Sequence, residues 1–400
     1  MTSIVATLGP ALDTPGLLAG MVDAGANVLR LPASKTPVAA LIARARELRA
    51  QPWAAGLRLW LDLPGAKTRL GNDTMLPLAG LDHLWLTTPG ATGTPAGVGG
   101  PVIALNGADL LGRARPGDVL LVGDGEDALR VTCTGPGWAQ VTPLTRGVLG
   151  IRRGLVLPGA LPGAGELTAD DEAGLADAAR AGVFDAVVVS FAQSAAQITR
   201  ARTLMRAATH GTTPLPQLFA KIETLEGARH TTAIASVADG VLLGRGDLLL
   251  DAGPLEFHAA VRAVLEGCRR AGCPVVVGTQ LLTSAGRGWL PHRSELATVC
   301  DLLEQGVDGL MLAEETAAGP DPVAVVELAV SLRNRYAPTG AASRAGIPAA
   351  TPAGAAVPVA VPVVAPVAAV RAVPGMAVPA AETTAVRAVP VAVARIGVRS

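Results

Sequence analysis

Short apolar runs that end abruptly in Gly, Pro or charged residues alternate with stretches whose apolar residues recur at helical spacing. Three runs come early: SIVATLGP, NVLRLPAS and LRLWLDLPGAKTRLG. Five come later: DAVVVSF, PLPQLFAKIE, DGVLLGRGD, CPVVVGTQ and VDGLMLAEET. Continuous apolar runs are typical of parallel strands that are buried on both faces. Eight such strand–helix units predict an α/β fold, the TIM (β/α)8 barrel, built from residues 1–71 and 163–336.

The helical spacing stops over residues 72–162. Short Val- and Leu-rich runs there, DHLWLTT, GDVLLVGDG, DALRVTCTG and WAQVTPL, are separated by Gly, Pro and Thr. Such runs indicate small antiparallel strands joined by turns. We therefore expect a small β-domain inserted after the third barrel strand. The barrel should resume at a helix capped by Thr168, with Asp170, Asp171 and Glu172 in its first turn.

Residues 337–400 have a different composition, dominated by Ala, Val, Pro and Gly. No charged residue lies between Ala345 and Val370, a length that could span a bilayer. Prolines recur every few residues in that segment, however, and each one disfavours a helix. We therefore expect a disordered, polyproline-like tail and no membrane-spanning segment.

Composition and charge exclude several classes of function. The chain is 50% hydrophobic, enough for a large core and more than one domain, and its formal net charge of +0 argues against a nucleic-acid partner. The four cysteines show no C-x-x-C spacing, and no signal-peptide pattern precedes Ser3. We expect a reduced, cytoplasmic protein. These features leave open whether it forms a homo-oligomer.

The most informative stretch runs from Phe219 to Asp247. Lys221 and Glu223 follow one predicted strand, and Asp247 follows the next. The carboxyl ends of barrel strands meet at one rim, where these folds keep their chemistry. Two carboxylates buried there need positive charge, which predicts a Mg²⁺ or Mn²⁺ ion at Glu223 and Asp247. Lys221 has the charge to hold a phosphoryl group; the alternative is a purely structural Lys–Glu–Asp cluster.

This stretch resembles the pyruvate kinase family. Its segments KIETLEG and DGVLLGRGDL are similar to the family's K-I-E-N-x-E-G and D-G-I-M-V-A-R-G-D-L, and GDVLLVGDGE and IRRGLVLPG are similar to phrases of its lid domain. The resemblance covers most of residues 3–330 and implies that the inserted domain is a small β-barrel lid. It implies transfer of a phosphoryl group from phosphoenolpyruvate to ADP, giving pyruvate and ATP, with Mg²⁺. The usual C-terminal α/β domain of the family has no recognisable counterpart in residues 337–400.

The resemblance also implies roles for individual residues. Lys221 and Arg30 would stabilise the phosphoryl group, Arg69 would reach both the nucleotide and that phosphate, and Thr279 would lie near the enolate carbon that is protonated. Glu223 and Asp247 would hold the metal. The implied substrate-binding residues are Gly244, Arg245, Gly246, Asp247, Ser190 and Thr279.

One motif departs from the K⁺-dependent pattern of the family. The family's L-D-T-K-G-P-E-I-R-T-G is LDLPGAKTRLG here, so that Lys67 stands at the Glu position and Leu63 and Leu70 at Thr positions. A tethered ammonium can supply the charge that K⁺ otherwise brings. Family members that do without K⁺ carry a similar exchange. We expect Lys67 to act as an internal cation and K⁺ not to be required; the alternative is a Lys67 that points to solvent.

Other departures keep two further interpretations open. Pro32 and Lys35 replace the Asn and His of the family's N-F-S-H-G motif, and Gln193 replaces the Arg of S-F-V-R-S. These changes fit a catalytically impaired homologue that binds phosphoenolpyruvate or a nucleotide as a regulator, although the retained carboxylate pair favours an enzyme. A lyase or aldolase that handles pyruvate enolate on a similar barrel is the third interpretation. The inserted domain and Arg69 count against it.

Overall fold

The computed structural model describes residues 2–9, 14, 16–89, 91, 99–107, 109–160, 166–209, 214–287 and 290–338. These residues belong to the first of two compact units of the chain, Met1–Pro352. The predicted disordered tail lies outside the described residues, apart from residues 337 and 338. Within the described residues, no helix is long and apolar enough to cross a membrane.

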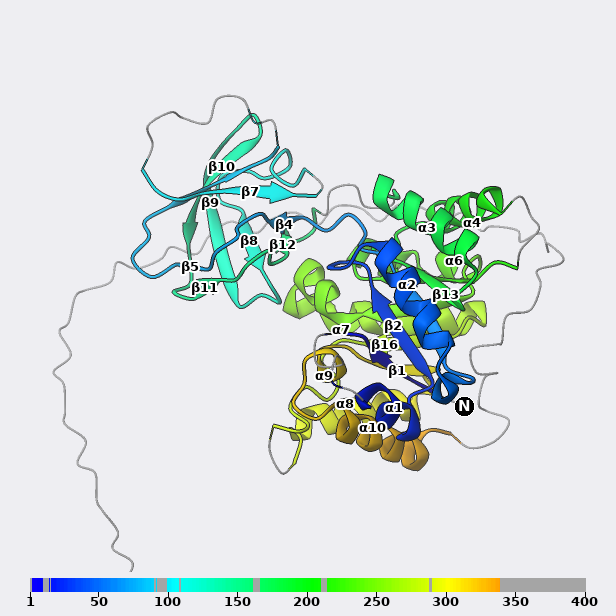
Figure 1. Ribbon diagram of the computed structural model, residues 1–400. Helices are drawn as coiled ribbons and strands as arrows, with labels where there is room; N and C mark the ends of the chain where they lie inside the picture. Colours follow the sequence, from blue (N-terminus) through cyan, green and yellow to red (C-terminus); the bar gives the residue numbers. More distant parts are fainter. Residues whose placement is uncertain are drawn as a thin grey trace, which may run out of the picture. The chain divides into compact units, whose positions relative to one another are not determined.

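Eight parallel strands close into the predicted barrel, in the order β1-β17-β16-β15-β14-β13-β3-β2 (Figure 1). Their bounds are β1 (Ser3–Thr7), β2 (Val28–Pro32), β3 (Arg58–Asp62), β13 (Ala186–Val189), β14 (Gln217–Ile222), β15 (Gly240–Gly244), β16 (Val275–Gly278) and β17 (Gly309–Leu312). Most of their residues are buried, because the barrel interior covers one face and the helices cover the other. The predicted fold class is therefore confirmed.

Two aromatic rings fill the middle of the barrel. Trp60 and Phe219 have ring centroids 4.3 Å apart and belong to an inner cluster to which all eight strands contribute. A Cβ atom at Gly240 would lie 2.3 Å from the Phe219 ring, and one at Gly278 would lie 2.3 Å from Met311. Glycine at these two positions leaves room for the large side chains that the barrel packs inside.

Helices follow the barrel strands. They are α1 (Leu17–Asp23), α2 (Val38–Arg49), the 3₁₀ helix η2 (Pro52–Ala54), α3 (Ala169–Ala181), α4 (Ala195–Ala208), α5 (Leu225–Arg229), α6 (Thr231–Ala235), α7 (Arg245–Ala271), α8 (Arg293–Glu304), α9 (Glu314–Ala317) and α10 (Pro322–Tyr336). The predicted cap of α3 is confirmed: Thr168 accepts a hydrogen bond from Asp171 N, and the Asp171 side chain accepts one from Thr168 N. Helix α7 begins directly after β15 and is kinked at Gly253.

The insertion after β3 forms a second sheet with its own apolar core. Seven strands lie in the order β12-β8-β9-β10-β6-β7-β4, and β5 (Leu76–Pro77) pairs with β11 (Val148–Leu149). The seven are β4 (Arg69–Leu70), β6 (Leu84–Thr87), β7 (Val102–Asn106), β8 (Val119–Val122), β9 (Asp127–Gly135), β10 (Trp138–Pro143) and β12 (Leu155–Val156). The sheet is nearly closed, as the predicted lid requires. Arg69 lies on β4 of this sheet, although the predicted boundary put it with the barrel.

Candidate active site

The carboxyl ends of the barrel strands meet around a cavity of about 170 Å³. Every predicted catalytic, internal-cation and metal-binding residue lines it: Arg30, Lys67, Arg69, Lys221, Glu223, Asp247 and Thr279. Gly244, from the predicted substrate-binding set, lines it too. The other three members of that set do not line the cavity. Ser190 and Arg245 form hydrogen bonds with the lining residues Lys221 and Thr279, and Gly246 packs beside Thr279.

Lys221 lies at the centre of a buried charge network. Its Nζ is 3.2 Å from Asp62 Oδ2 and 3.4 Å from Glu223 Oε1, and it donates a hydrogen bond of 3.0 Å to Ser190 Oγ. Arg30 reaches the same Asp62 carboxylate, with its Nε 2.6 Å from Oδ2. Burial would raise the pKa of Asp62, but Lys221 and Arg30 outweigh burial and hold that pKa below its usual value. Asp62 therefore stays ionised and fixes both cations.

Asp62 is the residue of this network that the sequence prediction left out. It is 2% exposed and ends the third barrel strand, so a carboxylate at the end of an apolar run was the available signal. Its effect reaches Lys221 directly. Burial lowers the pKa of Lys221, yet attraction from Asp62 and Glu223 brings that pKa above its usual value. Lys221 therefore carries its positive charge inside the barrel rim.

Glu223 is short of positive charge. Burial raises its pKa to about 7; Lys221 opposes this shift, and the negative charges of Asp247 and Asp62 reinforce it. Its Oε2 accepts a hydrogen bond of 3.3 Å from the backbone N–H of Phe191, which has a left-handed φ of 53°. A carboxylate in this state favours the binding of a cation in exchange for its proton.

Glu223 and Asp247 follow the neighbouring strands β14 and β15. Among the residues that the structure describes, no group of three or more His, Cys, Asp or Glu side chains could hold a metal ion. Mg²⁺ does not need such a group, because proteins usually bind it with one or two carboxylates while water and substrate oxygens complete the shell. The donor atoms of Glu223 and Asp247, together with the raised pKa of Glu223, fit a divalent cation held in this way.

Lys67 turns into the cavity. Its Nζ donates to both oxygens of Asp247, at 2.6 Å and 2.8 Å, and its side chain is 18% exposed. A Lys67 that points to solvent is therefore wrong for this structure. Room for the lysine depends on Gly154, since a Cβ atom there would lie 2.5 Å from Lys67 Cε. The ammonium thus sits on one of the two carboxylates predicted to bind metal.

Thr279 has a strained backbone. Its φ is 74°, a value that β-branched residues rarely adopt and that costs about 1–3 kcal/mol. Arg245 holds this loop in place by donating hydrogen bonds to the carbonyl oxygens of Gly278, Thr279 and Gln280. Arg245 therefore acts through its contacts with the loop, and its backbone at the beginning of α7 remains beside Thr279.

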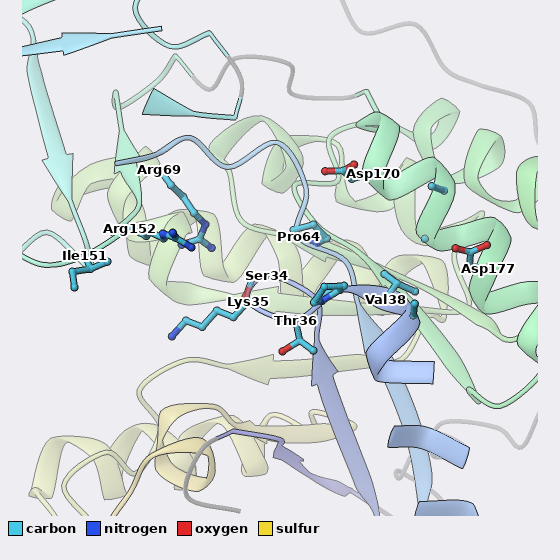
Figure 2. A pocket seen from close by; sticks show the side chains of 15 residues that line it. Ser34, Lys35, Thr36, Val38, Pro64, Arg69, Ile151, Arg152, Asp170 and Asp177 are labelled. Atoms are coloured by element: carbon cyan, nitrogen blue, oxygen red, sulfur yellow. The ribbon is translucent and has the colours of Figure 1, made fainter. Parts of the chain in front are cut away.

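A larger cavity of about 780 Å³ adjoins the first, and Arg69 lines both. Figure 2 shows Arg69, Arg152 and Lys35 on one side of this second cavity and Asp170 and Asp177 on the other. Burial lowers the pKa of Arg69, and attraction to Asp247 opposes that shift. The guanidinium of Arg69 therefore lies between the smaller, charged cavity and the larger one.

The residues that depart from the family motifs have distinct places. Pro32 lines the smaller cavity and Lys35 the larger one. Gln193 faces neither cavity: its Nε2 donates a hydrogen bond of 3.0 Å to Thr224 Oγ1, beside Glu223. Gln193 thus braces the loop that carries the buried carboxylate.

Comparison with known proteins agrees with these features. A model of the pyruvate kinase barrel domain matches residues 1–326. The chain belongs to the pyruvate kinase family. The resemblance inferred from the sequence motifs is thereby confirmed.

Curated relatives named pyruvate kinase cover most of this chain. One from Agrobacterium vitis is 33% identical over 332 residues, which is 82% of this chain and 66% of the relative. One from Aeropyrum pernix is 31% identical over 334 residues, 83% of this chain and 70% of the relative. One from Sporosarcina psychrophila is 31% identical over 335 residues, which is 82% of this chain and 55% of the relative. The chain thus spans between 55% and 70% of the length of these relatives.

Proposed function

We propose that this chain is a pyruvate kinase-like phosphotransferase that converts phosphoenolpyruvate and ADP into pyruvate and ATP with Mg²⁺ or Mn²⁺. The observation that carries the proposal is the buried network in which Asp62 holds Lys221 and Arg30 beside Glu223. Phosphoryl transfer depends chiefly on positive charge fixed where negative charge spreads over the phosphoryl oxygens. Lys221 and Arg30 supply that charge from positions that need no rearrangement.

The beginning of α7 would receive the substrate carboxylate. Gly244 precedes the helix and provides no side-chain cap, which leaves backbone N–H groups of the first turn directed outward. Such an end attracts anions. Thr279 lies beside it, because a Cβ atom at Gly246 would be 2.9 Å from Thr279 Cγ2. The Thr279 hydroxyl would then hold the proton that the enolate carbon takes up.

Glu223 and Asp247 would hold the divalent cation, which when bound neutralises charge on the phosphoryl oxygens. Lys67 adds an ammonium on the Asp247 side, at 2.6 Å. This ammonium would replace K⁺, so that the enzyme does not require that ion. ADP would occupy the larger cavity, with Arg69 reaching from its phosphates to the transferred group and Lys35 and Arg152 nearby.

A coupled assay for pyruvate with phosphoenolpyruvate, ADP and Mg²⁺ tests the proposal. We expect turnover that EDTA abolishes, and a Lys221→Met preparation made in parallel controls for host pyruvate kinase. The second candidate, a regulator that binds without turning over, is favoured by the replacement of Asn and His at Pro32 and Lys35. Saturable binding of ADP or phosphoenolpyruvate with no turnover above that control would support the regulator and overturn the enzyme.

A further inference from the structure

Asp251, on the second turn of α7, is a buried carboxylate that contacts two distant segments. It is 8% exposed. Its Oδ2 accepts a hydrogen bond of 2.7 Å from the backbone N–H of Leu225, and its Oδ1 accepts one of 3.1 Å from Gly159 N. Leu225 lies two residues after Glu223, and Gly159 lies where the chain returns from the inserted sheet. Within the described residues, no Lys, Arg or His forms an ion pair with Asp251.

The residues that donate to Asp251 are themselves held in place by their local structure. Gly159 has φ 70°, and a Cβ atom there would meet nothing, so glycine is needed for the backbone conformation that turns the N–H toward Asp251. Thr224, next to Leu225, accepts hydrogen bonds from Gly227 N and from Gln193. Hydrogen bonds from N–H groups to a carboxylate are stronger than neutral ones. The segment after Glu223 is therefore held at two consecutive residues, Thr224 by Gln193 and Leu225 by Asp251.

Asp247 and Asp251 are four residues apart and face the same side of α7. Asp247 binds Lys67, on the connection that leads into the inserted sheet, whereas Asp251 binds Gly159, on the connection that leads out. One face of α7 therefore holds both connections between the barrel and the inserted sheet. The same face supports the loop of Glu223.

We propose that Asp251 is a positioning residue that couples the return connection of the inserted domain to the Glu223 loop. The part of this inference that concerns metal binding rests on the proposed function. Loss of Asp251 should let the Glu223 carboxylate move and let the return connection open. Partners that orient a metal ligand in this indirect way are typically worth 10–100-fold in metal affinity.

The test compares Asp251→Asn and Asp251→Ala with Asp239→Asn in the full chain. Asp239 is the control at the opposite end of β14: its carboxylate also accepts a 2.7 Å backbone hydrogen bond, from Leu218 N, and in addition pairs with Arg202 at 3.1 Å. Asparagine keeps the size of Asp251 and one acceptor oxygen, so this variant should fold even if the alanine variant does not. Two quantities are measured without turnover: hydrogen–deuterium exchange of the peptides around 155–160 and 223–229, and Mn²⁺ affinity by titration of the free ion.

We expect exchange in both peptides to accelerate and Mn²⁺ affinity to fall about tenfold in Asp251→Asn, with neither change in Asp239→Asn. Faster exchange in both peptides while wild type binds no Mn²⁺ would support the coupling and count against the proposed function instead. Unchanged exchange, or acceleration in only one of the two peptides, would overturn the coupling.

Discussion

Asp62 and Glu223 are both buried in the cavity, at 2% and 4% exposure, and their pKa values shift in opposite directions. The number and distance of cations explain the difference. Asp62 forms ion pairs with Arg30 at 2.6 Å and Lys221 at 3.2 Å, whereas Glu223 forms one with Lys221 at 3.4 Å and feels Lys67 only from farther away. Asp62 is therefore ionised and holds Arg30 and Lys221. Glu223 has too little positive charge nearby to stay fully ionised.

The pKa of Glu223 predicts how stability changes with pH. Because its pKa is raised from 4.5 to about 7, the folded chain keeps a proton that the unfolded chain has lost. The stabilisation from this group is complete below about pH 4.5 and is lost as pH rises through about 7. In metal-free urea titrations between pH 5 and 8, the unfolding free energy of wild type should fall by on the order of 2 kcal/mol relative to Glu223→Gln. Parallel curves for the two proteins would contradict the shift.

Lys221→Met should lower kcat by on the order of 10³-fold or more, because in the proposed reaction its charge acts on the transition state of phosphoryl transfer. The circular dichroism spectrum should be unchanged, since Glu223 can take up a proton once the ammonium is gone. Steady-state kinetics at saturating Mg²⁺ gives the measurement. Activity within about threefold of wild type would remove Lys221 from the mechanism.

Lys67 should make activity independent of K⁺. Rates in tetramethylammonium, Na⁺ and K⁺ at matched ionic strength should be equal, because the ammonium at 2.6 Å from Asp247 is supplied by the chain itself. Lys67→Glu should lose activity in K⁺-free buffer, and adding Pro32→Asn and Leu63→Thr to it should restore a response to K⁺. A wild-type protein that has no activity in tetramethylammonium and a many-fold higher rate in K⁺ would show that Lys67 has another role.

The first two turns of α7 organise the site as one element. Arg245 holds the loop after β16, Asp247 holds Lys67, and Asp251 holds the segments around Leu225 and Gly159. The kink at Gly253, before Pro254, separates these turns from the rest of the helix. The short segment can therefore face the cavity while the remainder packs along the barrel.

Arg245→Lys should lower kcat about tenfold or more while leaving the charge in place. Lysine cannot reproduce the planar guanidinium that donates to three successive carbonyl groups, so Thr279 should relax from its φ of 74°. Arg202→Lys is the control, because Arg202 donates to a backbone carbonyl, that of Val237, away from the cavity. Equal kcat values for the two variants would show that the loop needs no such support.

In the whole molecule, the inserted sheet leaves and rejoins the barrel at adjacent points. Leu155 N donates a hydrogen bond of 2.9 Å to Thr68 O, and Leu70 N donates one of 2.9 Å to Arg153 O. The insertion also has an apolar core separate from that of the barrel. A segment with neighbouring ends and its own core can be removed with little strain on the remainder.

Replacing residues 69–154 by two glycines should therefore leave a barrel that unfolds cooperatively. The cavity carboxylates Glu223 and Asp247 remain in this variant, so Mn²⁺ binding should persist. ADP binding should be lost, because Arg69, Ile151 and Arg152 of the larger cavity are removed. Calorimetry measures the unfolding transition, and titrations with Mn²⁺ and with ADP measure binding. A variant that aggregates would show that the barrel depends on the insertion.

The sequence by itself determined the barrel, the inserted β-domain and most of the candidate site. Parallel strands buried on both faces appear in a sequence as continuous apolar runs, and the charged residues that end such strands must meet at one rim. The sequence alone therefore predicts that Lys221, Glu223 and Asp247 lie together, as they do in the cavity. Family motifs extended the set to Arg30, Arg69, Lys67 and Thr279.

Tertiary structure alone decided which of these groups touch. The partners of Lys67 and Asp251 lie 180 and 92 residues away along the chain, and no local pattern encodes such pairs. Three further features arise only from tertiary contacts: the support that Arg245 gives its neighbouring loop, the anchoring role of Asp62, and the unequal pKa shifts of two buried carboxylates. They depend on distances between side chains, which periodicity does not specify because it fixes only the face on which a residue lies.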